Sequence, residues 1–78
     1  MKKSEIQVGK TYHNGKEGNR SYSSRQVLEI SEKMRCPING WTYPHGVKFK
    51  QIKGRYAGDI MAISFEAFAQ WAKGEVRE

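Results

Sequence analysis

Cysteine, proline and long apolar runs are scarce in this 78-residue sequence. Its one cysteine excludes an intramolecular disulfide, so packing alone must hold the fold together. The longest apolar stretch, residues 60–63, is far shorter than the ~20 residues that cross a bilayer, and we expect no membrane span. The basic N-terminus leads into no apolar segment of about 7 to 15 residues, which argues against a secretory signal and for a cytoplasmic protein.

The chain is too short for more than one domain, which we expect to span residues 1–78. A chain of this size buries about 60% of its unfolded surface and supports one small core. No repeat or low-complexity tract divides it. A cofactor domain beside a substrate domain is therefore excluded, and we predict no cofactor. So small a core leaves both a monomer and a homodimer open.

Positive charge is in excess and unevenly distributed. The sequence has 14 Lys and Arg against 8 Asp and Glu, a net charge of +6, with an isoelectric point of about 9.7 and a mean hydropathy of -0.81. The excess lies in residues 10–55, whereas residues 59–78 are mildly acidic. A basic body of this kind favours anionic partners, and nucleic acid first.

The clearest local pattern predicts a helix over residues 65–73. From Phe65, apolar residues recur at i, i+3, i+4 and i+7, which is one face of a helix. Ser64 precedes this pattern as an N-cap, and Gly74 follows it as a stop. Ile63 and Phe68 occupy the two positions of a hydrophobic staple, so the preceding strand and the helix should join at a fixed angle.

The rest of the chain predicts short antiparallel strands, because β-branched and aromatic residues recur between glycine and asparagine clusters. The expected strands cover residues 11–13, 21–30, 47–51 and 60–63. Ile52 breaks the alternation of the third strand, which predicts a bulge or a strand end near Gln51. Residues 33–46 contain both prolines and are expected to form the longest irregular loop.

The expected fold is mainly β with one C-terminal helix. A small SH3-like antiparallel barrel shelters the few inward residues most economically. The alternative is an open antiparallel sheet with one packed helix, an α+β arrangement. Both predict the same core: Val8, Tyr12, Leu28, Ile30, Val47, Phe49, Ile60, Ile63, Phe65, Phe68 and Trp71.

Two parts of the sequence form a recognisable pair. They are residues 4–12 (SEIQVGKTY) with 25–30 (RQVLEI), and residues 63–72 (ISFEAFAQWA). Together they resemble small SH3-like proteins encoded by bacteriophages and prophages, most without an assigned activity and some acting as host-takeover or anti-defence factors. The resemblance covers under half of the chain and includes no catalytic signature. It implies a phage-type protein in the cytoplasm of a bacterial host cell.

Residues suited to catalysis or metal binding are sparse. Cys36, His13 and His45 lack the paired short spacing of a structural zinc site, so we predict no metal. The two histidines with a nearby lysine could act as acid, base and phosphate clamp in a small basic nuclease toxin, yet they lie in separate loops. No nucleophile elbow or phosphate loop is present. We predict a protein that is not an enzyme, with the nuclease as a second alternative.

Basic residues interleaved with aromatic ones are the stronger feature. Cations neutralise phosphates, and exposed rings stack on bases. We expect a basic face that engages nucleic acid or a host nucleic-acid-handling complex. Its predicted contacts are Lys48, Lys50, Lys53, Arg55 and Tyr56, followed by Arg20 and Arg25. The competing interpretation is that outward lysines only protect sheet edges and keep the protein soluble.

Trp41 and Tyr43 support an alternative function. Tryptophan and tyrosine are frequent in the central contacts of protein interfaces. Both residues lie in the segment with the most turn formers, where burial is less expected than for Trp71. They predict a phage-encoded inhibitor, of the anti-defence or anti-CRISPR type, that acts by direct protein contact.

Overall fold

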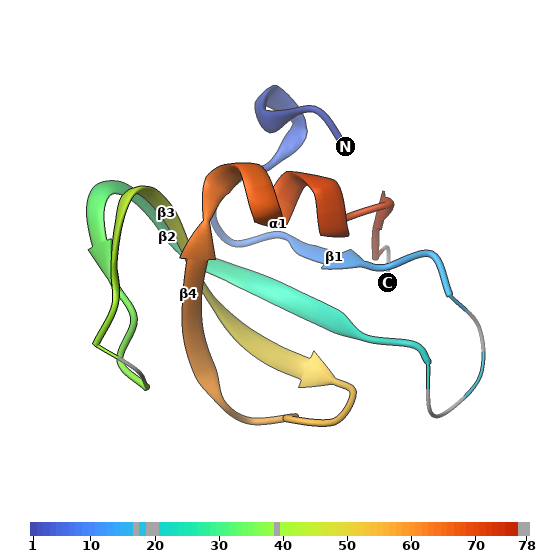
Figure 1. Cartoon of the computed structure of the whole chain (residues 1–78). Coiled ribbons are helices and arrows are strands. Elements are labelled where there is room, and N and C mark those ends of the chain that lie inside the picture. Colours follow the sequence, from blue (N-terminus) through green and yellow to red (C-terminus); the bar gives the residue numbers. More distant parts are fainter. Residues whose placement is uncertain (17, 19–20, 39, 77–78) are drawn as a thin grey trace.

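The computed structural model has five antiparallel strands in one open sheet and a single α-helix near the C-terminus (Figure 1). It describes residues 1–16, 18, 21–38 and 40–76. The elements are the 3-10 helix η1 (Lys3–Glu5), the strands β1 (Thr11–His13), β2 (Ser24–Arg35), β3 (Thr42–Lys53) and β4 (Ile60–Ser64), the helix α1 (Phe65–Trp71) and β5 (Gly74–Glu75). The strand order is β4-β3-β2-β1-β5. The mainly β class with one helix is confirmed; the SH3-like barrel is not, and the sheet is open as in the alternative.

The start of α1 agrees with its sequence signals. Ser64 has extended backbone angles, and its hydroxyl accepts a hydrogen bond of 3.1 Å from the Ala67 N–H, as an N-cap does. The helix ends at Trp71, two residues before the expected end at residue 73, because Ala72 is extended. Gly74 therefore begins β5 and does not terminate the helix. No helix in the described ranges is long and apolar enough to cross a membrane.

A bulge in β2 inverts the expected facing of its first half. Val27 pairs with Phe49 and Ile30 with Val47, so Leu28 is an extra residue on β2. Val27 is fully buried, whereas Leu28 is 37% exposed. The prediction that Leu28 belongs to the core was wrong for this reason, and Ile30 beyond the bulge packs against the core as expected.

The second register shift lies where the sequence predicts a bulge. Ser24 pairs with Lys53 and Arg25 with Gln51, which leaves Ile52 as an extra residue on β3. Ile52 is correspondingly exposed. The predicted irregularity near Gln51 is confirmed.

Most of the expected irregular loop, residues 33–46, belongs to strands. β2 continues to Arg35 and β3 begins at Thr42, so residues 36–38, 40 and 41 are the described residues between the two strands. Pro44 is tolerated because β4 pairs with β3 only from Gly46 onward, which leaves Pro44 with a strand on one side. Lys33 has a φ of 53°, a left-handed backbone conformation that bends β2 sharply.

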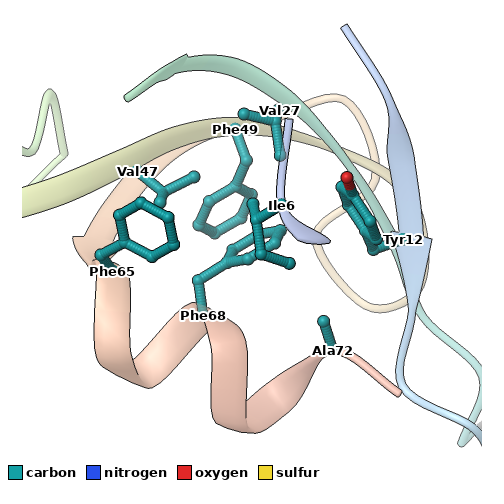
Figure 2. Packing of buried hydrophobic residues seen from close by; sticks show 8 residues of the cluster. All are labelled: Ile6, Tyr12, Val27, Val47, Phe49, Phe65, Phe68 and Ala72. Carbon is teal, nitrogen blue, oxygen red and sulfur yellow. The ribbon is translucent and has the colours of Figure 1, made fainter. Parts of the chain in front are cut away.

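The main core lies between α1 and one face of the sheet (Figure 2). Its buried members are Ile6, Tyr12, Val27, Val47, Phe49, Phe65, Phe68 and Ala72, with Met1, Ile30, Met61, Ile63 and Trp71 packed against them. Val8 and Ile60 were expected here, but they are 58% and 41% exposed. Ile60 is in the same rung as Lys50, on the other face, and the chain buries Ile6 in place of Val8.

A second, smaller cluster lies on the opposite face. Ala62 is fully buried although its neighbours Met61 and Ile63 pack against the main core, so its side chain points away from α1. Met34 and Cys36 cover Ala62, and Tyr43 packs against the three. The end of the β2–β3 hairpin therefore curls onto the face that α1 leaves uncovered.

Candidate nucleic-acid interface

The sheet face opposite α1, hereafter the uncovered face, carries the lysines of β3. Lys48 and Lys50 alternate with the buried residues Val47 and Phe49, so they project from this face. At ~3.3 Å per residue their positions are about 6.6 Å apart, comparable with the separation of adjacent phosphates on an extended strand. Lys50 is exposed and Lys48 is half-buried. Two predicted contacts thus share one face.

The neighbours of these lysines differ. Lys50 lies between Gln26 of β2 and the exposed Ile60 of β4, so its ammonium has no acidic residue in its rung. Lys48 lies between Glu29 and Ala62 in the next rung. Opposite charges directly across an antiparallel pair attract, so Glu29 offsets part of the charge of Lys48. Lys50 is the more available cation for an external anion.

Lys53 lies at the end of β3 and lines an open groove of about 580 Å³. The groove crosses the ends of β1, β2 and β3 on the uncovered face. It is lined by Gly9, Lys10, Thr11, Tyr22, Ser24, Gln26, Ile52, Lys53, Glu75 and Val76. Its volume lies in the range of ~300 to 1,000 Å³ that small-molecule sites occupy, enough for a nucleotide. Lys53 and Lys10 place two cations at this groove.

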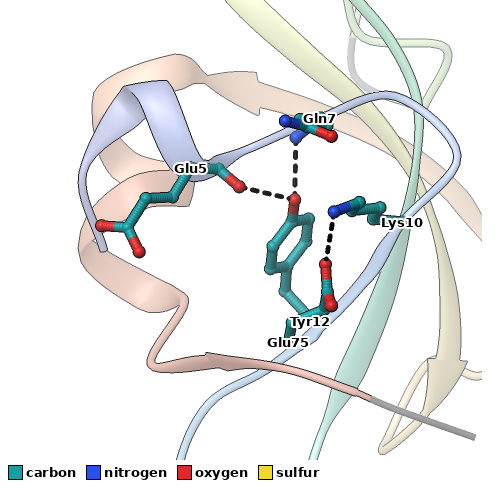
Figure 3. A network of polar contacts seen from close by, with 5 residues as sticks. All are labelled: Glu5, Gln7, Lys10, Tyr12 and Glu75. Atoms are coloured by element: carbon teal, nitrogen blue, oxygen red, sulfur yellow. Dashed lines mark hydrogen bonds and ion pairs between the residues drawn. The ribbon is translucent and has the colours of Figure 1, made fainter.

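A network of polar contacts lies next to the groove and includes Tyr12 (Figure 3). The Tyr12 hydroxyl donates to the Glu5 carbonyl and accepts from the Gln7 N–H, both at 2.8 Å. These bonds fix the segment that precedes the groove wall. Further along, Lys10 Nζ lies 3.1 Å from Glu75 Oε1, and this ion pair joins the wall to β5. Lys10 is therefore already partly neutralised.

An aromatic surface lies at the side of the groove. Tyr22 is half-buried, lines the groove, and stacks on His13 with ring centroids 6.2 Å apart and an interplanar angle of 22°. The Gly15 N–H donates to His13 Nδ1 at 3.0 Å, which fixes the histidine ring. Tyr22 thus offers a supported ring beside two lysines, an arrangement suited to stacking on a base.

Arg55 and Tyr56 lie in the turn between β3 and β4. The Arg55 guanidinium carbon lies 5.6 Å from the centre of the Tyr56 ring, and both side chains are exposed. Gln51 closes this turn, because its N–H donates to Asp59 and its carbonyl accepts from Gly58. The pair is close in sequence to Lys53 but projects from a turn rather than from the strand.

Arg25 lies on the other side of the sheet. Its guanidinium carbon lies 4.6 Å from the centre of the Phe49 ring and 4.1 Å from the centre of the Trp71 ring, and Nε donates to Gln51 Oε1 at 3.1 Å. Desolvation by burial lowers the pKa of Arg25 to about 10. The structure therefore separates Arg25 from Lys48, Lys50 and Lys53. Arg20, also expected here, lies outside the described residues.

Replacing Arg25 with alanine should lower stability by about 1 kcal/mol, because two cation–ring contacts and the packing of its aliphatic stem are lost. Urea unfolding followed by circular dichroism measures this change. Affinity for nucleic acid should fall no further than in Lys2→Ala, a control that removes the same charge from the N-cap of η1. A loss of affinity greater than in that control, with unchanged stability, would return Arg25 to the binding surface.

The two aromatic residues predicted for protein contact, Trp41 and Tyr43, differ in exposure. Trp41 is 66% exposed at the end of the β2–β3 turn. Tyr43 is half-buried against Met34, Cys36 and Ala62, so much of its ring supports the hairpin. Only Trp41 presents a large surface to a partner.

The histidines of the nuclease alternative do not converge. His13 pairs with Ser24 and His45 with Glu32, so about 26 Å of β2 length separates their rungs. His13 stacks on Tyr22, whereas His45 lies against Phe65 with centroids 4.9 Å apart. These two side chains assemble no acid–base pair. Within the described ranges, no three His, Cys, Asp or Glu side chains group as metal ligands.

Comparisons with known protein families, with curated proteins and with solved structures find no match to this chain. The sequence reasoning missed Gln26, Thr11 and Ser24, which face the groove. Ser24 and Gln26 are two residues apart on one strand, so the sequence alone could place them on the same face. The β1–β2 register that aligns Thr11 with Gln26 is not visible in a single sequence.

Proposed function

We propose that this protein is a phage-type binding protein that engages nucleic acid, alone or within a host nucleic-acid-handling complex, through the uncovered face of its sheet. The observation that carries the proposal is the position of Lys48, Lys50 and Lys53 on the face without a helix, next to a groove with a supported tyrosine ring. Phosphate neutralisation by lysines supplies most of the affinity of such contacts.

A single strand fits this surface better than a duplex. The groove has room for a base or a nucleotide, and a base can enter it only when it is unpaired. Tyr22 offers a ring for stacking, which tolerates any base because every base has a π face. Lys50 and Lys53 then contact phosphates on either side of the inserted base. Sequence preference should accordingly be weak.

The test is a salt series of binding to fluorescein-labelled single strands and duplexes of DNA and RNA, measured by anisotropy. The double variant Lys50→Ala/Lys53→Ala should bind single strands about tenfold more weakly at moderate salt. Its plot of log affinity against log salt should be flatter by about 1.4, since each phosphate contact on a single strand contributes ~0.7.

The matched control is Lys2→Ala/Lys3→Ala, which removes the same charge from the exposed N-cap and first residue of η1, on the α1 side of the sheet. This control should keep the wild-type slope. Equal losses in both double variants would reduce the effect to net charge and contradict the proposed face. A tighter complex with duplex than with single strand would contradict the groove as a base site.

A further inference from the structure

The turn between β2 and β3 exposes two large apolar side chains. Ile38 is 61% exposed and Trp41 is 66% exposed. Both lie in residues 36–41, at the far end of the hairpin from the groove. Neither contributes to the main core or to the second cluster. A tryptophan this exposed costs solvation free energy, which a bound partner would recover.

Backbone hydrogen bonds and two buried side chains hold the β2–β3 turn in place. The Cys36 N–H donates to the Trp41 carbonyl at 2.8 Å, and the Gly40 N–H donates to the Cys36 carbonyl at 2.9 Å. Met34 and Cys36 are 5% and 4% exposed, so the stem of the turn is anchored in the second cluster. Trp41 therefore projects from a fixed base and loses little conformational freedom on binding.

The charge around this tip is positive. Arg35 and Lys33 are both exposed on the strand that leads into the turn. The Arg35 guanidinium lies beside Gly40, since a Cβ built on Gly40 would be 3.7 Å from Arg35 Nη2. Residues 33–46 include no acidic residue. Arg35 thus places a cation beside Gly40, the residue before the exposed Trp41. A phosphate followed by an unpaired base would match a cation and a ring in this order.

The tip lies on the side of the sheet that also carries the β3 lysines. In Figure 1, α1 lies above the sheet, whereas the β2–β3 and β3–β4 turns extend below it. The second cluster agrees with this view, because it covers Ala62, the neighbour of Lys48 in its rung. A strand on Lys53, Lys50 and Lys48 would continue toward the hairpin.

We propose that Trp41 stacks on a base of the same nucleic-acid strand that lies on the uncovered face, while Arg35 contacts the adjacent phosphate. This proposal rests on the function proposed above and extends its site from the groove to the hairpin tip. The longest extent of the molecule is 33 Å. At ~3.4 Å per stacked nucleotide, the closest spacing, a strand of about ten nucleotides is long enough to reach both ends, and a more extended strand needs fewer.

The experiment titrates the full-length protein with a single-stranded oligonucleotide of about 12 nucleotides, within the range of site sizes for small stacking domains. Tryptophan fluorescence reports stacking, and anisotropy reports affinity. The tryptophan fluorescence of the wild-type protein should be quenched when the oligonucleotide binds. Trp41→Phe should lose the quenching, because Trp71 alone remains, and should keep its affinity within about threefold, since phenylalanine also stacks. Trp41→Ala should bind about tenfold more weakly with an unchanged salt slope.

Val8→Ala removes an exposed apolar side chain elsewhere and should bind as wild type does. Unchanged affinity of Trp41→Ala, with weakened binding of Lys50→Ala/Lys53→Ala, would overturn the tip proposal and leave the uncovered face intact; Trp41 would then be a protein contact. If binding quenches Trp41 while Lys50→Ala/Lys53→Ala keeps wild-type affinity, the uncovered face would not be the binding surface. The proposed stacking at Trp41 would then stand alone. No binding of any oligonucleotide would overturn both.

Discussion

Replacing Phe68 with alanine should remove about 3 to 5 kcal/mol of the free energy of unfolding, the usual loss for a buried phenylalanine. Phe68 is fully buried and touches three rings: Tyr12 at 6.0 Å, Phe49 at 5.7 Å and Trp71 at 5.3 Å between centroids. It therefore joins α1 to both β1 and β3. Domains of this size have only about 5 to 15 kcal/mol in total, so the variant should lose a large fraction of its stability.

Urea unfolding monitored by circular dichroism measures the loss. Ile60→Ala serves as the matched control, because Ile60 is a large apolar residue on β4 that is 41% exposed. The control should cost less than about 1 kcal/mol. If both variants lost the same free energy, the position of the main core between α1 and the sheet would be incorrect.

Replacing Gly46 with valine should cost about 2 kcal/mol net. A Cβ on Gly46 would lie 2.5 Å from the Met34 Cβ and 3.2 Å from the Ile63 carbonyl oxygen, so the bent end of β2 would have to move away. Overpacking of this kind costs about 1 to 3 kcal/mol. The better strand propensity of valine returns at most about 1 kcal/mol.

The displacement should be visible at Cys36, the single cysteine of the chain, which is 4% exposed beside Met34. A thiol reagent should label Gly46→Val several-fold faster than wild type under native conditions. Thr42→Val, an isosteric change at an exposed position of β3, should leave labelling unchanged. Wild-type labelling and stability of Gly46→Val would show that β2 does not bend over Gly46.

Local signals were sufficient for α1 and its N-cap. The helix depends on contacts within a few residues, and Ser64, Phe65 and Phe68 are all in one short segment. The end of the helix was misjudged because it depends on a distant partner. The Lys73 N–H donates to the His13 carbonyl, and the chain leaves the helix to reach β1. That interaction is not encoded in the residues near the C-terminus of the helix.

The arrangement of β2 was not predictable from alternation alone. One extra residue at Leu28 reverses the facing of everything before it, so Arg25 and Val27 turn toward α1. The contact at Arg25 was expected because this residue is one of the basic residues interleaved with aromatic ones, and the structure places its side chain on the α1 face against Phe49 and Trp71. Of the two bulges, only the one in β3 is visible in the sequence. Ile52 interrupts the alternation of apolar and polar residues in its strand, whereas Leu28 fits the alternation expected for β2.

The lysines of β3 were predictable as a set because Val47 and Phe49 separate them with clear alternation. The strands of the β2–β3 hairpin were not predictable, because the prolines and glycines between residues 33 and 46 are typical of loops. Pro44 and Gly46 instead occur where β3 loses one neighbour and where Met34 crosses it closely. Long-range contacts decide both positions, and propensity reports only local preference.

The two borders of the sheet differ in their capacity for self-association. The border at β5 is formed by two residues, Gly74 and Glu75, one of them ion-paired, so it offers little backbone for a further strand. The border at β4 is longer and begins with an exposed isoleucine. Of these two end strands β4 has the longer backbone edge, so concentrated solutions should self-associate by β4-to-β4 contact between two copies rather than through β5. A charged residue at position 60 would be the simplest means of preventing it.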